Sequence, residues 1–184
     1  MKGKETMRLE RASREMYHQI YKLYMEAFPA EERAPFRHLI HRAELGKADL
    51  WNLYEEKQWT GFLYVLSLKK VAYIFYLAID SAQRGKGFGT AAIEAMKQRY
   101  KGYRIFVSLE NPNEIADNAP QRIERYMFYK RCGFEDLPCR VREGTVVFAL
   151  MGIGECIQPE EYRELIDHSL GKMYRHIFCL KIVE

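Results

Sequence analysis

The segment at residues 71–79 constrains the fold of this chain most, because every one of its side chains is apolar or aromatic. A strand that is apolar on both faces is covered on both sides, so it belongs inside a sheet with helices packed against it. It is followed by a glycine-rich basic loop, then a helical stretch containing Ile93 and Met96, then a mostly apolar strand at residues 103–109. A strand, a helix and a strand in this order predict a crossover between two parallel neighbouring strands.

Two helical patterns and a strand pair precede this crossover. Apolar side chains recur at three- and four-residue spacing over residues 13–28, and Pro35 opens a second such stretch that Gly46 ends. Apolar residues alternate between residues 50 and 70, which predicts an antiparallel meander. We therefore expect an α/β fold with a mixed, mostly antiparallel sheet of about seven strands, helices on both faces and one β-α-β crossover.

The pattern continues beyond the crossover to the end of the sequence. It predicts a helix at residues 121–131, two strands near residues 136–141 and 145–151, and a tail with a helix at about residues 159–170 and a strand within residues 174–183. We expect a single domain over residues 1–184, with a core at about residues 6–151 and the tail, residues 152–184, packed on it. The tail strand could extend the sheet edge or pair with a second subunit, so both a monomer and a homodimer fit.

Composition limits the class of protein. The 184 residues suit one domain, and the net charge of +4 comes without a basic stripe, so we expect no nucleic-acid partner. No secretory signal or membrane-length apolar run is present, which favours a cytoplasmic protein with no membrane partner. The four cysteines form no C-x-x-C pair, so reduced thiols are expected, and His38 and His41 lack a third ligand for a metal.

The glycine-rich loop after the central strand predicts a phosphate-binding site. Backbone N–H groups at a helix N-terminus attract anions, and glycines let the main chain approach a phosphate closely. Glycines alternate here between basic side chains, which add positive charge. The structural alternative is a turn that merely reverses the chain. The candidate binding residues are Arg84, Gly85, Lys86, Gly87, Phe88, Gly89 and Thr90.

Residues 87–92 also match the dinucleotide-binding pattern G-x-G-x-x-A, with an acidic residue, Glu110, at a strand end about 20 residues further on. In that pattern the glycines follow their strand directly, whereas residues 81–86 intervene here. Only one crossover is visible, and a meander precedes it. A nicotinamide- or flavin-dependent oxidoreductase is therefore the weaker alternative.

Residues 77–80, 83–90 and 128–134 together resemble the GNAT family of acyl-CoA-dependent N-acetyltransferases. The glycine-rich run is similar to the acetyl-CoA motif of that family, with Arg84, Gly87 and Gly89 at its defining positions. The resemblance covers about residues 6–151. It implies acetyl-CoA as cosubstrate, no metal, and transfer of the acetyl group to a primary amine of a small molecule or peptide by direct attack in a ternary complex.

The resemblance also implies roles for individual residues. The main chain of Leu77, Ala78 and Ile79 would pair with the pantetheine arm, and an N–H at or near Leu77 would stabilise the oxyanion. Tyr129 would protonate the departing thiolate, the alternative being a core tyrosine. Many family members have Asn and Ala where this chain has Arg122 and Arg125, so either arginine could contact a CoA phosphate or face solvent.

The acceptor amine must lose a proton, and Glu110 is the candidate base because it closes the strand beside the expected ligand channel. A solvated strand-end glutamate is the alternative, and Glu55 and Glu56 are weaker candidates. The acceptor is expected where the first two helices meet the meander, and acidic and aromatic residues there suit a cation. A CoA-binding sensor without turnover remains the alternative function. The acceptor-binding candidates are Phe28, Glu32, Phe36, Trp51 and Tyr73.

Overall fold

The computed structural model describes residues 7–111 and 117–183. The chain divides into two compact units. The first comprises Met1–Val65 and Phe75–Lys101, and the second comprises Leu66–Ile74 and Gly102–Glu184. Two strands, β3 (Gln58–Leu68) and β4 (Val71–Ile79), contribute residues to both units. The single domain expected over residues 1–184 stays a prediction.

The described residues form an eight-stranded sheet in the order β1-β2-β3-β4-β5-β7-β6-β8. β4 and β5 are parallel, with Val71 opposite Arg104 and Ile74 opposite Val107, whereas β1–β2, β2–β3, β5–β7, β6–β7 and β6–β8 are antiparallel. The predicted α/β fold with a mixed, mostly antiparallel sheet and one crossover is therefore confirmed, with one strand more than expected. The other strands are β1 (Arg8–Arg11), β2 (Asp49–Glu55), β5 (Arg104–Leu109), β6 (Glu135–Glu143), β7 (Val146–Ile153) and β8 (Lys181–Val183).

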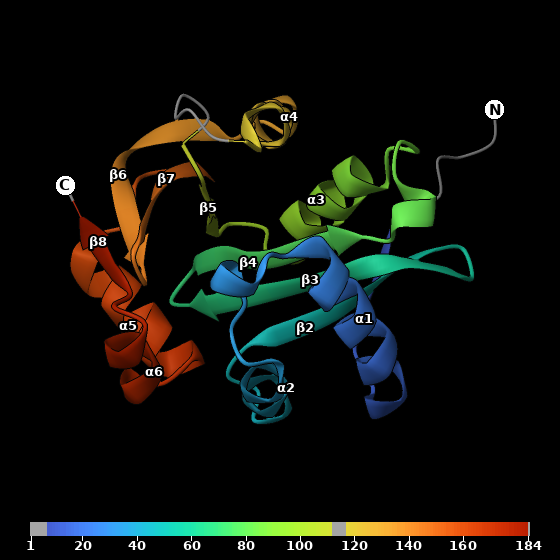
Figure 1. The fold of residues 1–184 in the computed structure, drawn as a ribbon, viewed down its shortest axis with the longest axis horizontal. Coiled ribbons are helices and arrows are strands. Elements are labelled where there is room, and N and C mark those ends of the chain that lie inside the picture. The colour runs from blue at the N-terminus through green and yellow to red at the C-terminus, as the bar shows by residue number, and fades with distance from the viewer. Residues whose placement is uncertain (1–6, 112–116, 184) are drawn as a thin grey trace. The chain divides into compact units, whose positions relative to one another are not determined.

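In the first unit, helices cover both faces of the sheet. α1 (Tyr17–Ala27) and α2 (Phe36–Glu44) lie on one face and α3 (Phe88–Arg99) on the other (Figure 1). The spacing seen in the sequence explains α1, because Ile20, Leu23 and Tyr24 form its buried stripe. Residues 13–28, predicted as one helix, begin with a short 3₁₀ turn at Arg14–Met16 before α1.

The second unit combines three helices with the other strands of the sheet. The helices are α4 (Ala119–Arg131), α5 (Pro159–Ser169) and α6 (Lys172–Ile177). Gln158 and Glu161 form a reciprocal capping box that fixes the start of α5. Glu161 is also paired with Arg104 of β5, whose Nη1 lies 3.1 Å from the Glu161 Oε2. The capping box and this ion pair hold the first turn of the tail helix against β5.

Two strand predictions need correction. Residues 174–177, expected within a strand, belong to α6, and only Lys181–Val183 pair as a strand, antiparallel to β6 at the edge of the sheet. The sequence also gave no sign of β1, because three of its four side chains are exposed and charged and no alternation is visible. Leu9 is its only apolar residue. None of the helices within residues 7–111 and 117–183 has the length and apolarity needed to cross a membrane.

The expectation of reduced cysteines is wrong for two of the four. Cys139 of β6 and Cys156, just before α5, form a disulfide with an S–S distance of 2.02 Å. They are 17 residues apart, and the β6–β7 hairpin returns the chain so that they meet. The sequence contains no local motif that predicts this disulfide, because the two cysteines meet only when the strands pair. Cys132 and Cys179 are free, the former buried and the latter exposed.

Candidate active site

The loop that follows β4 is held to the first unit by several hydrogen bonds. The Asp80 N–H donates to the Thr60 carbonyl at 2.8 Å, and the Asp80 carboxylate accepts from the Ala82 N–H at 2.9 Å. Arg84 Nε donates to the Ile79 carbonyl at 3.2 Å. The beginning of the loop is therefore fixed to β3 and to the end of β4, ahead of the glycines.

The glycines of this loop form an open cradle at the N-terminus of α3. Gly85 and Gly87 have φ of +77° and +84°, and a Cβ at either would meet no atom within 4 Å. The Ala91 N–H donates to the Gly87 carbonyl at 3.1 Å and begins the helical hydrogen bonds, so the N–H groups of the preceding turn point out of the helix end. Arg84 and Lys86 flank the cradle, and the geometry, dipole and charges all suit a phosphate group.

The predicted pantetheine strand, residues 77–79, forms the end of β4. Leu77 and Ile79 are half-buried and Ala78 is buried. Gly61 of β3 lies very close to this segment, because a Cβ on Gly61 would be 2.1 Å from the Ala78 carbonyl oxygen. The close approach of the two strands sets the position of the Ala78 main chain.

Two of the predicted acceptor residues meet in an aromatic cluster beside α1. Tyr24 lies between Phe28, Phe36 and Tyr76, with ring centroids 5.6, 5.5 and 5.0 Å from its own. The Tyr76 hydroxyl donates to the carbonyl of Glu32 at 2.8 Å, which brings the main chain of this third candidate to the same cluster. The structure thus gathers Phe28, Glu32 and Phe36.

Main-chain contacts hold the loop between α1 and α2 against this cluster. The Tyr24 hydroxyl donates to the Ala34 carbonyl at 2.8 Å, and the Ala34 N–H donates to the Tyr76 hydroxyl at 2.9 Å. Burial raises the pKa of Tyr24 to about 12, so its phenol stays neutral and remains a donor at physiological pH. The hydroxyl groups of Tyr24 and Tyr76 therefore hold the main chain of residues 32–34 in place.

Trp51 is not brought to this cluster. It pairs with Leu63 on β3, whereas the neighbouring Phe62 contacts Tyr24, and successive side chains of a strand point to opposite faces. The Trp51 indole donates to the Tyr100 hydroxyl at 3.0 Å, and the Arg99 guanidinium lies 4.9 Å from its ring centroid. Trp51 thus packs near the end of α3.

Tyr73 lies in the second unit, among residues that the sequence did not single out. Its ring stacks on Phe106 at 4.5 Å between centroids, and its hydroxyl hydrogen-bonds with Ser108 and with the Glu143 carboxylate. Ser108 carried a weak signal, as a hydroxyl within the otherwise apolar end of β5. Glu143 carried none, because a glutamate before Gly144 is typical of a solvated hairpin turn.

Glu110 follows β5 and is paired with both arginines that depart from the family pattern. Its carboxylate lies 2.6 Å from Arg122 Nη2 and 3.6 Å from Arg125 Nη1. Its side chain is 12% exposed, and that of Arg122 is 13% exposed, so this ion pair is largely screened from water. Asn118 also contacts both residues, since its amide nitrogen is 3.3 Å from Glu110 and its amide oxygen accepts from Arg122 Nε at 2.7 Å. Glu110 therefore anchors α4 to the end of β5.

Tyr129 is the buried residue of α4, and it is 5% exposed. Its ring contacts Phe128 and Phe134, at 4.9 and 5.2 Å between centroids. Burial raises the pKa of Tyr129 well above its usual value, and the positive charge of Arg125 only partly opposes the rise. The phenol therefore stays protonated at neutral pH, as a proton donor requires.

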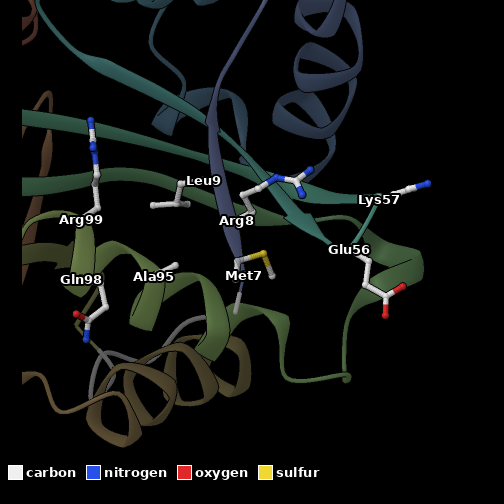
Figure 2. Close-up of a pocket in the computed structure, with 8 residues that line it drawn as sticks. All are labelled: Met7, Arg8, Leu9, Glu56, Lys57, Ala95, Gln98 and Arg99. Atoms are coloured by element: carbon white, nitrogen blue, oxygen red, sulfur yellow. The ribbon is translucent and has the colours of Figure 1, made fainter. Parts of the chain in front are cut away.

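A surface groove in the first unit does not involve these residues. Figure 2 shows it between β1, the β2–β3 turn and α3, with the charged ends of Glu56, Lys57 and Arg99 pointing in different directions. Of the candidate site residues, Glu56 alone lines it, and Glu56 was only a weaker candidate for the base. Within the described residues, moreover, no group of three or more histidine, cysteine or acidic side chains is placed to hold a metal ion. The lining residues are Met7, Arg8, Leu9, Glu56, Lys57, Ala95, Gln98 and Arg99.

Solved structures of acetyltransferases share this fold. A protein described as a GNAT-family acetyltransferase from Bacteroides thetaiotaomicron has a TM-score of 0.72 at 21% identity, over 93% of this chain and 98% of that one. A Bacillus subtilis acetyltransferase in complex with CoA has a TM-score of 0.56 at 15% identity, over 82% and 99% of the two chains. A variant of spermidine N-acetyltransferase from Vibrio cholerae has a TM-score of 0.60 at 15% identity, over 80% and 93%.

Identities this low show the fold alone, and the comparison with curated proteins finds no match. The family assignment comes from the amino-acid sequence. The model of the Acetyltransferase (GNAT) family matches residues 17–134, which is more than half of the chain and includes the glycine-rich loop, Glu110 and Tyr129. The chain therefore belongs to the GNAT family of acetyltransferases.

Proposed function

We propose that this protein transfers the acetyl group of acetyl-CoA to a primary amine of a small molecule or peptide, by direct attack while both substrates are bound. The observation that carries the proposal is the open cradle of Gly85 and Gly87 at the N-terminus of α3, flanked by Arg84 and Lys86. A pyrophosphate suits this place because N–H donors, the helix dipole and two cationic side chains all act on it.

Acetyl-CoA supplies the activated thioester when it is bound, and the residues of this chain hold and orient it. In the proposal, residues 84–90 bind the pyrophosphate, and the main chain of Leu77, Ala78 and Ile79 pairs with the pantetheine arm. Arg125 binds a further phosphate. Its side chain contacts Glu110 but is 43% exposed, so a phosphate can approach it from the solvent. An N–H at or near Leu77 stabilises the oxyanion.

Tyr129 donates the proton that the departing thiolate needs. Support comes from its raised pKa, which keeps the phenol protonated through neutral and mildly alkaline pH. No alkaline loss of activity below about pH 10 should therefore trace to ionisation of Tyr129, since the usual pKa of a tyrosine is about 10 and burial moves this one upward.

Glu110 is the proposed base for the acceptor amine, and Glu110→Gln should lower kcat at least about tenfold, the lower range for a general base. Because the same change breaks a largely buried ion pair with Arg122, it should also lower the melting temperature. Initial rates and thermal melts on one preparation separate the two effects, with Glu124→Gln on the exposed face of α4 as the control. A lowered melting temperature with unchanged kcat would assign Glu110 a structural role alone.

The acceptor is proposed to bind beside the aromatic cluster of the first unit, with Phe28, Glu32 and Phe36 as contacts. Trp51 and Tyr73 were predicted with them and remain proposals, although neither belongs to that cluster. An acidic and aromatic surface favours a cationic acceptor. A cytoplasmic location and a monomeric or homodimeric state also remain proposals, as does the single domain that would join these functions.

The deciding experiment measures thiol release from acetyl-CoA across a panel of primary amines, together with calorimetric binding of CoA. Wild-type protein should bind CoA and release thiol with at least one amine. The double variant Arg84→Ala, Lys86→Ala should bind CoA at least about tenfold more weakly, because each charge-assisted contact contributes about 1.5–3 kcal/mol. Lys22→Ala, Lys47→Ala removes two exposed charges elsewhere in the same unit and is the matched control.

The outcomes distinguish the alternatives. Binding of CoA without thiol release from any amine would indicate a CoA-binding sensor. Saturation by NAD or FAD, with no heat of CoA binding, would indicate an oxidoreductase and contradict the assignment of the loop. Equal CoA affinity in the wild type and in the Arg84, Lys86 double variant would show that the phosphate lies elsewhere.

A further inference from the structure

A polar cluster lies inside the second unit, where the proposed chemistry uses only one of its members. Tyr73 comes from β4, Ser108 from β5, Glu143 from the end of β6 and Tyr162 from α5. Four elements that are far apart in sequence thus bring three hydroxyl groups and one carboxylate together. Convergence of this kind is unusual in an apolar core, because each polar group must be satisfied there.

The carboxylate of Glu143 is oriented by two hydroxyl groups. The Tyr73 hydroxyl donates to Glu143 Oε1, and the Ser108 hydroxyl donates to the Tyr73 oxygen and lies 3.5 Å from Glu143 Oε1. Tyr73 is buried, and burial together with the charge of Glu143 raises the pKa of its phenol well above the usual value. The phenol is thus neutral and donates, so the carboxylate is held in place as an acceptor.

The cluster is only partly exposed to solvent. Ser108 and Glu143 are half-buried, whereas Tyr73 and Tyr162 are fully covered. A carboxylate at such a boundary attracts a cation more strongly than a surface carboxylate does, because less water screens it. Glu143 therefore presents negative charge at the partly exposed edge of this cluster of hydroxyl groups.

Tyr162 supplies a second, independent observation. Its hydroxyl is buried and has no hydrogen-bond partner among residues 7–111 and 117–183, although such a group costs about 1–3 kcal/mol when left unpaired. Burial raises the pKa of Tyr162, and the negative charge of Glu143 adds to the rise, so the phenol lies within electrostatic range of that carboxylate. The phenol oxygen of Tyr162 and the carboxylate can each accept a hydrogen bond from a group with N–H donors.

We propose that Glu143 determines acceptor specificity by binding a positively charged amino group of the acceptor substrate, with Tyr73 and Ser108 as positioning residues and the Tyr162 hydroxyl as a further hydrogen-bond acceptor. This inference rests on the proposed acetyltransferase function and adds the substrate class, an amine that is cationic when it binds. A protonated amine fits because its N–H groups donate in several directions, whereas a carboxylate or phosphate would be repelled by Glu143.

The test compares Glu143→Gln with the wild type in steady-state thiol release, varying the amine and acetyl-CoA separately. Glutamine keeps the size of the side chain and an oxygen that can accept from Tyr73, but it removes the charge. The KM for an aliphatic amine that is protonated at the assay pH should rise at least tenfold, which corresponds to about 1.4 kcal/mol. The KM for acetyl-CoA should stay within about twofold of the wild-type value, the ordinary scatter of context effects.

Two further variants keep the test decisive if Glu143→Gln folds poorly in a thermal melt. Glu143→Asp keeps the charge and should recover most of the affinity for the amine. Tyr73→Phe removes only the donor that orients the carboxylate and should raise the KM for the amine by a smaller factor than Glu143→Gln does. Glu160→Gln, at an exposed position of the first turn of α5, is the matched control and should change neither KM.

The following results would overturn the proposal. One is an unchanged KM for the cationic amine in Glu143→Gln, and another is an equal rise for an aryl amine that is uncharged at the assay pH. If the wild type releases no thiol with any amine, the acetyltransferase proposal fails separately. Calorimetry of wild type and Glu143→Gln with the aliphatic amine alone then still tests the site, and equal affinities would refute it.

Discussion

Replacing Tyr129 with phenylalanine should lower kcat at least about tenfold, which is the lower range for loss of a general acid. The substitution removes one oxygen from a buried ring that packs between Phe128 and Phe134, so the ring contacts and the fold should be kept. The affinity for acetyl-CoA should not change, because the phenol acts only as the thiolate departs. Initial rates with a saturating amine, beside calorimetric binding of CoA, measure both quantities.

Tyr126→Phe is the matched control, because Tyr126 lies on the same helix and its hydroxyl donates to Asp136 at 2.9 Å in a solvent-accessible position. It should leave kcat close to the wild-type value. A kcat in Tyr129→Phe that equals the control would mean that Tyr129 is only a core tyrosine, and water would then be the proton donor.

Replacing Gly61 with valine should strongly destabilise the first unit. A Cβ at this position would lie 2.1 Å from the Ala78 carbonyl oxygen and 3.0 Å from the Ile79 Cα, so β3 and β4 must separate to make room. Forcing atoms into a packed interior costs about 3 kcal/mol, and for a chain of this length that lowers the melting temperature by about 6–12 °C.

The same displacement should weaken CoA binding, because the Ala78 main chain belongs to the proposed pantetheine strand. Gly46→Ala is the control: its φ of +67° disfavours a side chain, but a Cβ there meets no atom within 4 Å. Thermal melts and calorimetry on both variants separate backbone conformation from collision. Equal losses of stability in the two variants would show that the close approach of β3 and β4 contributes little to the effect of Gly61→Val.

The sequence predicted the elements whose side-chain pattern is set by burial. The apolar segment at residues 71–79 became β4, and the helix after the glycine loop became α3, because a strand covered on both sides and an amphipathic helix have distinct patterns. β1 was not predicted, because an edge strand with charged side chains has no such pattern. Residues 174–177 of α6 were expected within a strand, because a short element of mixed residues has no pattern that favours a helix over a strand.

Site residues that are close together in the sequence could be predicted to lie together, whereas those far apart in the sequence could not. Phe28, Glu32 and Phe36 lie together because they flank one short loop that folds back on α1, while their binding of the acceptor stays a prediction. Trp51 was grouped with them because it lies on the meander that follows the two helices, but strand alternation places its ring near Tyr100 instead. Glu143 could not be predicted at all, because its link to Tyr73 spans 70 residues and exists only once β4 and β6 are in place.

The loop between α1 and α2 is positioned by the phenols of Tyr24 and Tyr76, and both bind peptide groups rather than side chains. These contacts with the main chain of residues 32–34 thus do not depend on which side chains those residues carry. Substitutions at Glu31 or Glu32 can alter the charge presented to an acceptor while the route of the backbone is preserved. Under the proposed acceptor-binding role of this loop, exchange of these two residues would change which amine is preferred, as long as the two tyrosines are retained.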